Sequence, residues 1–125
     1  MNGKTILVID DDSAVRHTVR VMLERAGYLV READNGEEGV KLYRDARTDL
    51  VITDLFMPQQ DGIETIQQIR AEFPDARILA VSGGASIGAE GPLIDARMLG
   101  ADETLAKPFS KEDLLQRVRG LIETG

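Results

Sequence analysis

The chain has 125 residues, of which 15 are basic and 22 acidic, and its net charge is −7. This length suits one domain with a single core, so we expect residues 1–125 to form that domain without a separate output domain. The negative charge would repel the phosphates of nucleic acid and anionic lipid, and the absence of cysteine excludes disulfides and thiolate metal sites.

Apolar strands alternate with amphipathic helices in the first half of the sequence. The run TILVID at 5–10 predicts a strand that is buried on both faces. Ser13 can cap the helix that follows, and Gly27 supplies a left-handed end to it. The next elements are, in order, a strand at 28–34, a helix at 35–46 and a strand at 49–54.

The same alternation continues to the end of the chain. Apolar residues from Ile63 to Phe73 recur at helical spacing, and Pro74 closes that helix. Residues 82–91, SGGASIGAEG, contain four glycines in ten residues, which is typical of a loop. The remaining elements are a strand at 77–82, a helix at 92–100, a strand at 103–106 and a helix at 110–123 that begins with the Ser110 to Asp113 capping pattern.

Five strands alternating with five helices predict a doubly wound α/β fold. In this fold a five-stranded parallel sheet carries helices on both faces. Right-handed connections place the carboxyl ends of all strands at one edge, and binding sites lie outside that edge where the strand order reverses. Functional residues are therefore expected at the carboxyl ends of the strands.

The amino-terminal residues do not have the pattern of a leader. MNGKTILVID has one lysine ahead of a short apolar run and lacks a small-residue cleavage pattern. No segment of the sequence approaches the length that spans a membrane. We expect a soluble, cytoplasmic protein that binds neither membrane nor nucleic acid.

The residues at the strand ends have complementary chemistry. Clustered aspartates repel one another unless a cation lies between them, and an all-oxygen cluster suits a hard ion such as Mg²⁺. Such an ion beside a carboxylate, a hydroxyl and an ammonium is the arrangement that phosphoryl transfer needs, with Asp54 as the acceptor. These residues are Asp10, Asp11 and Asp12 after the first strand, Asp54 after the third, Ser82 after the fourth and Lys107 after the fifth.

Each of these residues also has a simpler interpretation. Aspartates between a strand and a helix are usually helix caps, and Asp54 could be a turn former. Ser82 beside two glycines suits a turn, and Lys107 could be a solvated charge. All these residues are expected at one edge of the sheet. This shared placement favours a functional site over a set of unrelated caps and turns.

Four motifs resemble the receiver domain of response regulators, the phosphoacceptor of two-component signalling. They are LVIDDD, VITDLFMPQQDG, ILAVSGG and LAKPF, and together they span essentially the whole chain. The resemblance implies a flavodoxin-like (βα)5 fold with a five-stranded parallel sheet. It also implies Mg²⁺ as the cofactor, with Asp10, Asp11, Asp54 and the main-chain carbonyl of Phe56 as its ligands.

The resemblance further assigns the residues that handle the phosphoryl group. Asp54 corresponds to the phosphoacceptor, Ser82 to the switch hydroxyl and Lys107 to the phosphate-pairing lysine, which in this family usually precedes a cis proline, here Pro108. The loop that shapes the site corresponds to Met57, Pro58, Asp61 and Gly62.

Partners and activity follow from the same resemblance. A histidine kinase or a histidine phosphotransfer protein would donate the phosphoryl group. The chain would act as a stand-alone regulator through protein contacts with a downstream target, and it would not be an enzyme beyond its own phosphorylation and dephosphorylation. The surface that responds would be the fourth helix, fifth strand and fifth helix.

Thr104 departs from the family pattern. Many receiver domains have an aromatic residue three positions before the lysine, and that ring rotates when the switch hydroxyl moves. Because Thr104 cannot provide this rotation, we expect the glycine-rich segment 83–91 to carry the switch instead.

Three basic positions on the first helix have a simple explanation. His17 falls outside the apolar stripe that runs through Val15 and Val19, so it is expected to be solvated. Arg16 and Arg20 are four residues apart and could meet an acidic partner, but a solvated face is the preferred interpretation.

Two other functions remain open from the residues alone. Haloacid-dehalogenase-like phosphatases also carry an aspartate pair after the first strand, but the DDDSA sequence at 10–14 lacks the final Thr or Val of their motif. A flavin-binding electron carrier would share the fold, but it would need a phosphate-cradling loop and more aromatic residues than the three Phe and two Tyr present. Catalytic turnover of phosphoesters would indicate the first, and a bound yellow chromophore the second.

Overall fold

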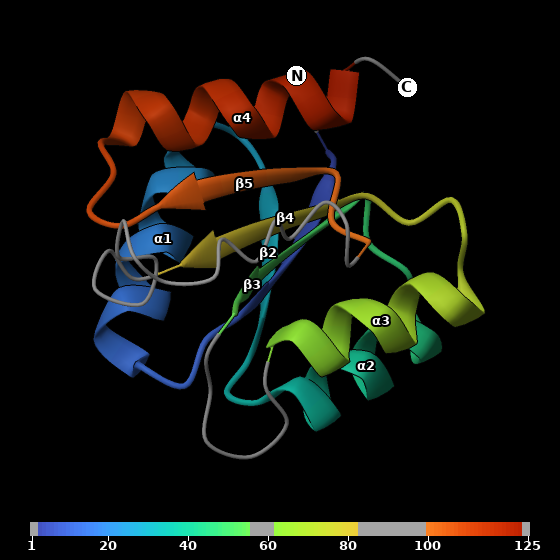
Figure 1. Cartoon of the computed structure of the whole chain (residues 1–125). Coiled ribbons are helices and arrows are strands. Elements are labelled where there is room, and N and C mark those ends of the chain that lie inside the picture. The colour runs from blue at the N-terminus through green and yellow to red at the C-terminus, as the bar shows by residue number, and fades with distance from the viewer. Residues whose placement is uncertain (1–2, 56–61, 83–99, 124–125) are drawn as a thin grey trace.

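The computed structural model describes residues 3–55, 62–82 and 100–123, and within these ranges it contains five strands and four helices (Figure 1). The predicted helix at 92–100 and the glycine-rich segment 83–91 therefore lie outside the described residues, apart from Gly100 in a turn. No helix in the described ranges is both long and apolar enough to cross a membrane. In chain order the elements are β1 (Thr5–Ile9), α1 (Ser13–Arg25), β2 (Leu29–Ala33), α2 (Gly36–Asp45), β3 (Leu50–Asp54), α3 (Gly62–Glu72), β4 (Ile78–Ser82), β5 (Glu103–Ala106) and α4 (Lys111–Glu123).

All five strands pair in parallel in the order β2-β1-β3-β4-β5. This arrangement confirms the predicted flavodoxin-like α/β fold. Starting from β1, the chain adds β2 on one side and then β3, β4 and β5 on the other, so the order reverses between β1 and β3. The carboxyl ends of β1 and β3 are therefore the place where a binding crevice is expected.

Helices cover both faces of the sheet, as the buried strands require (Figure 1). Alternate residues of β1 point to opposite faces: Ile6 and Val8 pack with α1 and α4, whereas Leu7 and Ile9 pack with α2 and α3. The two sets form separate apolar clusters, one on each side of the sheet. This burial fixes the register of the strands, because a shift by one residue would exchange the two faces.

The helix ends follow local capping rules, with one correction. The cap of α1 is Asp12, not Ser13, because the Asp12 carboxylate accepts hydrogen bonds from the main-chain N–H groups of Ala14 (3.0 Å) and Val15 (3.2 Å). Both residues are good caps, and the one that sits in extended backbone takes the role. The predicted capping pattern of α4 is confirmed, since Ser110 Oγ accepts a 3.0 Å hydrogen bond from the N–H of Asp113.

Candidate functional site

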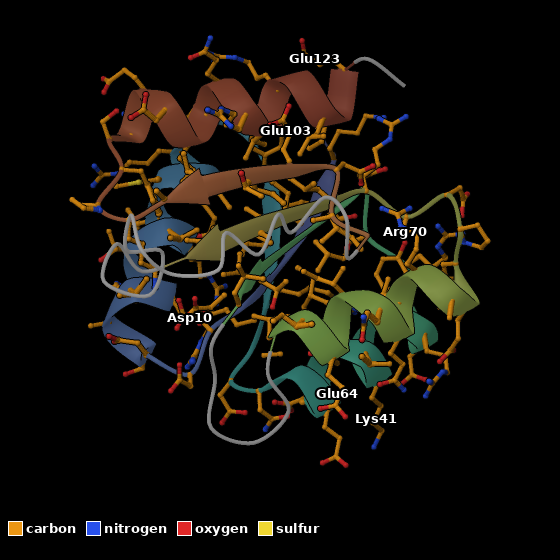
Figure 2. The ribbon with its side chains drawn as sticks, viewed as in Figure 1. Asp10, Lys41, Glu64, Arg70, Glu103 and Glu123 are labelled. Carbon is orange, nitrogen blue, oxygen red and sulfur yellow. The ribbon has the colours of Figure 1, made fainter. Side chains whose placement is uncertain are left out.

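Three strands deliver the charged groups of the candidate site to one edge of the sheet. Asp10 directly follows β1, Asp54 is the last residue of β3, and Lys107 directly follows β5. Figure 2 shows Asp10 on the side of the molecule toward which the arrows of β4 and β5 point. The parallel sheet thus places residues that are up to 97 positions apart in sequence beside one another.

The carboxylates and the ammonium lie within ion-pair distance. The Nζ atom of Lys107 is 3.4 Å from Asp10 Oδ2 and 3.5 Å from Asp54 Oδ2. Asp10, Asp11 and Asp54 each offer an oxygen, and these oxygens lie within 4.8 Å of one another. Asp10 and Asp54 are buried whereas Asp11 is exposed, so the cluster lies half in the protein and half toward solvent.

Local hydrogen bonds hold the Asp10 carboxylate and the backbone at the end of β3 in place. The N–H of Asp12 donates a 2.9 Å hydrogen bond to Asp10 Oδ1, so the α1 cap residue also fixes the first carboxylate. Thr53 Oγ1 donates to the main-chain oxygen of Asp54 at 3.0 Å. The N–H of Gly62, at the start of α3, donates to the main-chain oxygen of Leu55 at 2.8 Å. The acidic cluster is therefore built on the ends of rigid elements.

The chemistry of these groups fits a magnesium ion. Three carboxylates and one ammonium carry a net charge of −2, which one divalent cation balances. All the candidate ligands are hard oxygens, which suit Mg²⁺, and the exposure of Asp11 leaves room for the waters that Mg²⁺ keeps. Lys107 neutralises one of the three charges, so the cluster favours a further cation.

The structure brings together four of the predicted site residues and places Gly62 at the start of α3, whereas the five others lie partly or wholly outside its described ranges. Asp10, Asp11, Asp54 and Lys107 meet as expected, and the peptide bond between Lys107 and Pro108 is cis. Ser82 ends β4, where it pairs in register with Ala106, but its side chain is not among those described. The other predicted residues, Phe56, Met57, Pro58 and Asp61, lie outside the described ranges.

The predicted environment of Arg16, which lies next to the site, is wrong. Arg16 was expected on a solvated face, but only 16% of its side chain is exposed. It donates from Nη1 to the main-chain oxygen of Asp10 at 2.6 Å and from Nε to Glu32 at 2.7 Å. His17 is exposed, as predicted. Only the pairing of β1 with β2 brings Glu32 near Asp10, so helical spacing alone could not reveal this contact.

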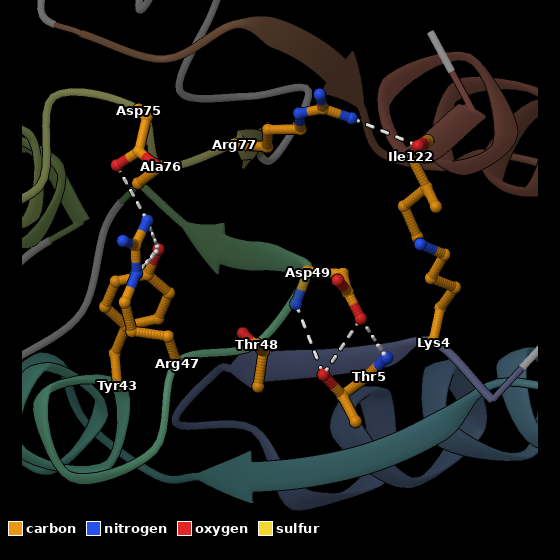
Figure 3. A pocket seen from close by; sticks show the side chains of 10 residues that line it. All are labelled: Lys4, Thr5, Tyr43, Arg47, Thr48, Asp49, Asp75, Ala76, Arg77 and Ile122. Atoms are coloured by element: carbon orange, nitrogen blue, oxygen red, sulfur yellow. Dashed lines mark hydrogen bonds and ion pairs between the residues drawn. The ribbon is translucent and has the colours of Figure 1, made fainter. Parts of the chain in front are cut away.

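A hollow at the opposite edge of the sheet does not offer comparable chemistry (Figure 3). Its charged side chains are mainly engaged within the protein. Arg47 donates to the Tyr43 hydroxyl and to Asp75, while Arg77 donates to main-chain oxygens at the end of α4. The main-chain N–H of Thr5 donates to Asp49 at 2.8 Å. These bonds join the amino-terminal ends of the strands to the neighbouring helices and give the hollow a structural role.

Comparisons with known proteins agree with this geometry. The family model described as "Response regulator receiver domain" matches residues 6–119. Response regulator MprA of Mycolicibacterium vanbaalenii is 41% identical over 117 residues, which cover 94% of this chain and 49% of MprA. The transcriptional regulatory protein ResD of Bacillus subtilis is 36% identical over 97% of this chain and 49% of its own length. The chain thus spans about half the length of these curated relatives.

A solved structure of a response regulator has a similar fold to this chain. The crystal structure of response regulator protein TrrA from Thermotoga maritima, determined in complex with Mg²⁺-BeF, has a TM-score of 0.83 and 33% sequence identity to this chain. The match covers 94% of this chain and 98% of TrrA.

Proposed function

The chain belongs to the response regulator receiver domain family, and from that premise we propose that it accepts a phosphoryl group onto Asp54 in a reaction that requires Mg²⁺. Receiver domains of response regulators interact with histidine kinases, so the donor we propose is a phosphohistidine of such a kinase or of a histidine phosphotransfer protein. One observation carries the proposal: the carboxylate of Asp54 lies in a cluster with two further carboxylates and the ammonium of Lys107.

The residues of the cluster have separate roles in the proposed reaction. Asp10, Asp11 and Asp54, together with the main-chain carbonyl of Phe56, would hold Mg²⁺, which when bound neutralises the oxygens of the incoming phosphoryl group. A carboxylate oxygen of Asp54 attacks phosphorus in line. The bond from phosphorus to the donor nitrogen breaks, and that nitrogen keeps the electron pair.

Lys107 and Ser82 then stabilise the product. The ammonium of Lys107 already lies 3.5 Å from the Asp54 carboxylate, so it can pair with a phosphoryl oxygen without moving far. The Ser82 hydroxyl would hydrogen-bond a second oxygen. Phosphorylation adds a charge of about −1.5 to −2 at neutral pH, and this new charge is what we propose biases the protein toward its active state.

The consequences for partners follow from this change in charge. We propose that the signal passes to another protein through β5 and α4, together with the predicted helix at 92–100 that lies outside the described ranges. The cytoplasm is the typical location of the family. The expectation that the chain acts without an output domain stays a prediction, because its relatives are about twice as long.

Intact mass measurement after incubation with MgCl₂ and acetyl phosphate tests the proposal. A single phosphoryl adduct should form on the wild-type chain and should be absent both from Asp54→Asn and after removal of Mg²⁺ with a chelator. An adduct that persists in Asp54→Asn would contradict the assignment of the acceptor. Repeated turnover of a phosphoester substrate without a stable adduct would instead support the phosphatase alternative.

A further inference from the structure

A hydrogen-bonded chain of three side chains leads from the surface of α1 to the acidic site. Arg20 donates from Nη1 to Glu32 Oε2 at 2.6 Å, and Arg16 donates from Nε to Glu32 Oε1 at 2.7 Å. Arg16 then donates from Nη1 to the main-chain oxygen of Asp10 at 2.6 Å. The Glu32 carboxylate, on β2, therefore holds two guanidinium groups of α1, and one of them reaches the end of β1.

The oxygen that Arg16 holds has a special position in the site. It belongs to the peptide group that joins Asp10 to Asp11, and both residues contribute carboxylates to the cluster. Because a peptide group is rigid and planar, a hydrogen bond that holds its oxygen restrains the direction in which the chain continues to Asp11. The relative orientation of the two carboxylates thus depends on a peptide group that Arg16 anchors.

The environment of Arg16 suits this task. Its side chain is only 16% exposed, and hydrogen bonds from a guanidinium are stronger than neutral ones. Hydrogen bonds from Arg20 first and Arg16 next hold the pKa of Glu32 below its usual range, so Glu32 remains charged at neutral pH and balances Arg16. The ion pair between Arg16 and Glu32 would be enough to tie α1 to β2, and the further bond to Asp10 reaches the site itself.

We propose that Arg16 is a positioning residue of the magnesium site, which holds the Asp10–Asp11 peptide group in the orientation that lets both carboxylates face the same ion. This inference rests on the proposed function, since it takes the three aspartates to be the Mg²⁺ ligands. Glu32 supports the same geometry by fixing the direction of the Arg16 guanidinium.

Isothermal titration calorimetry with MgCl₂ provides the first test. Residues that orient metal ligands typically contribute a factor of about 10 to 100 in affinity, so Arg16→Met should raise the Mg²⁺ dissociation constant about tenfold. Glu32→Gln should raise it by a smaller factor, because Arg16 keeps its bond to Asp10 but loses its support. Arg44→Met is the matched control: Arg44 also donates two hydrogen bonds between elements, but both go to Glu72 and join α2 to α3, so its loss should leave Mg²⁺ affinity unchanged.

Amide hydrogen exchange of the metal-free protein provides a readout that does not depend on Mg²⁺ or on phosphorylation. The N–H of Asp12 bonds to Asp10 Oδ1, so its exchange should accelerate in Arg16→Met but not in Arg44→Met. A merely structural tie between α1 and β2 would alter stability without a selective effect at this amide.

The outcomes separate this inference from the proposed function. If the wild-type chain binds Mg²⁺ and Arg16→Met binds it within a factor of two, the positioning role is wrong and the metal site stands. If the wild-type chain does not bind Mg²⁺, both the metal site and this inference are wrong. Should Arg16→Met fail to fold by circular dichroism, Glu32→Gln decides, and an unchanged dissociation constant in that variant overturns the inference.

Discussion

Lys107 already provides part of the positive charge that the three aspartates require. Its ammonium lies 3.4 Å from Asp10 and 3.5 Å from Asp54, so it competes electrostatically with a bound metal ion. Lys107→Met should therefore bind Mg²⁺ more tightly, by at least about 1 kcal/mol or roughly fivefold, which is the interaction of two unit charges about 4 Å apart in water. The same variant should form the phosphoryl adduct more slowly, because it lacks the ammonium that we propose pairs with the transferred oxygens.

Calorimetry and intact mass measurement check this pair of opposite effects. Lys111→Met is the matched control, since Lys111 is an exposed lysine at the start of α4 and its loss should change neither quantity. Weaker Mg²⁺ binding in Lys107→Met would contradict the electrostatic argument.

Glu32 gives the protein a stability that depends on pH. Its pKa in the folded protein is held low, chiefly by the hydrogen bond from Arg20 and also by that from Arg16. A carboxylate of this kind stabilises the fold above its unfolded pKa of about 4.3, and the contribution disappears as the pH falls through the lower folded pKa. Glu32→Gln should thus lower the free energy of unfolding at pH 7 by about 1 kcal/mol, and by less at pH 3.5.

Urea unfolding at the two pH values measures the difference. Glu24→Gln serves as the control, because the pair that Glu24 forms with Arg20 at 3.0 Å is more exposed and should contribute less. An effect of Glu32→Gln that is equal at both pH values would show that packing, not the ion pair, is what the substitution disturbs.

The site could be predicted from sequence to the extent that it depends on strand ends. Asp10, Asp54 and Lys107 follow or end apolar runs, and parallel strands bring those ends together whatever the details of packing. Arg16 could not be predicted in the same way. Its partners are a main-chain oxygen and a side chain on β2. Neither contact can be predicted from the spacing of apolar residues in α1.

At the scale of elements, the start of α3 is pressed against the strand that carries Asp54. A methyl group on Gly62 would overlap the main-chain oxygen of Asp54 and the Cα atom of Leu55. Gly62→Ala should therefore displace the backbone at the end of β3, lower the free energy of unfolding by roughly 1–3 kcal/mol and weaken Mg²⁺ binding.

Gly120→Ala is the matched control for this substitution. Gly120 lies within α4, and a methyl group there meets no atom within 4 Å outside the adjacent backbone of its own helix. Because alanine is the better helix former, this variant should be more stable than the wild type by about 0.5–1 kcal/mol. Chemical denaturation and calorimetry of both variants distinguish two causes. One is the close contact of Gly62 with the end of β3, and the other is a general effect of the added methyl group.

Element identity was easier to predict than element ends. Every predicted strand and helix that falls in the described ranges is present, because buried runs and helical spacing report on long segments. The cap of α1 was assigned to Ser13 whereas Asp12 takes it, since two adjacent residues with equal capping ability differ only in backbone conformation. The start of α1 thus depends on the backbone conformation of the residues between β1 and α1, which the local sequence does not specify.

At the scale of the whole molecule, the acidic cluster should couple metal binding to folding. The three carboxylates come from the ends of β1 and β3, and they meet only when the sheet has formed. A ligand that binds only the folded state stabilises it by about 2.7 kcal/mol when its concentration is about 100 times the dissociation constant. MgCl₂ should therefore raise the free energy of unfolding of the wild-type chain by about this amount.

Urea titrations with and without MgCl₂, at matched ionic strength, measure this increase. Asp11→Asn is the useful comparison, because Asp11 is exposed and its replacement removes a proposed ligand without disturbing the core. The increase should be much smaller in that variant. Equal stabilisation of both chains would indicate a general salt effect in place of a specific site.

The ion pair between Lys107 and Asp10 joins positions 97 residues apart. This separation determines how late in synthesis the acidic cluster can be completed. A ribosome that adds about 5–20 residues per second needs roughly 5–20 seconds to reach Lys107 after it has added Asp10. During that interval the nascent chain exposes its acidic pair without the lysine that later neutralises it. A receiver domain still in synthesis therefore lacks the complete cluster that we propose accepts the phosphoryl group, and it can form that cluster only after Lys107 has been added.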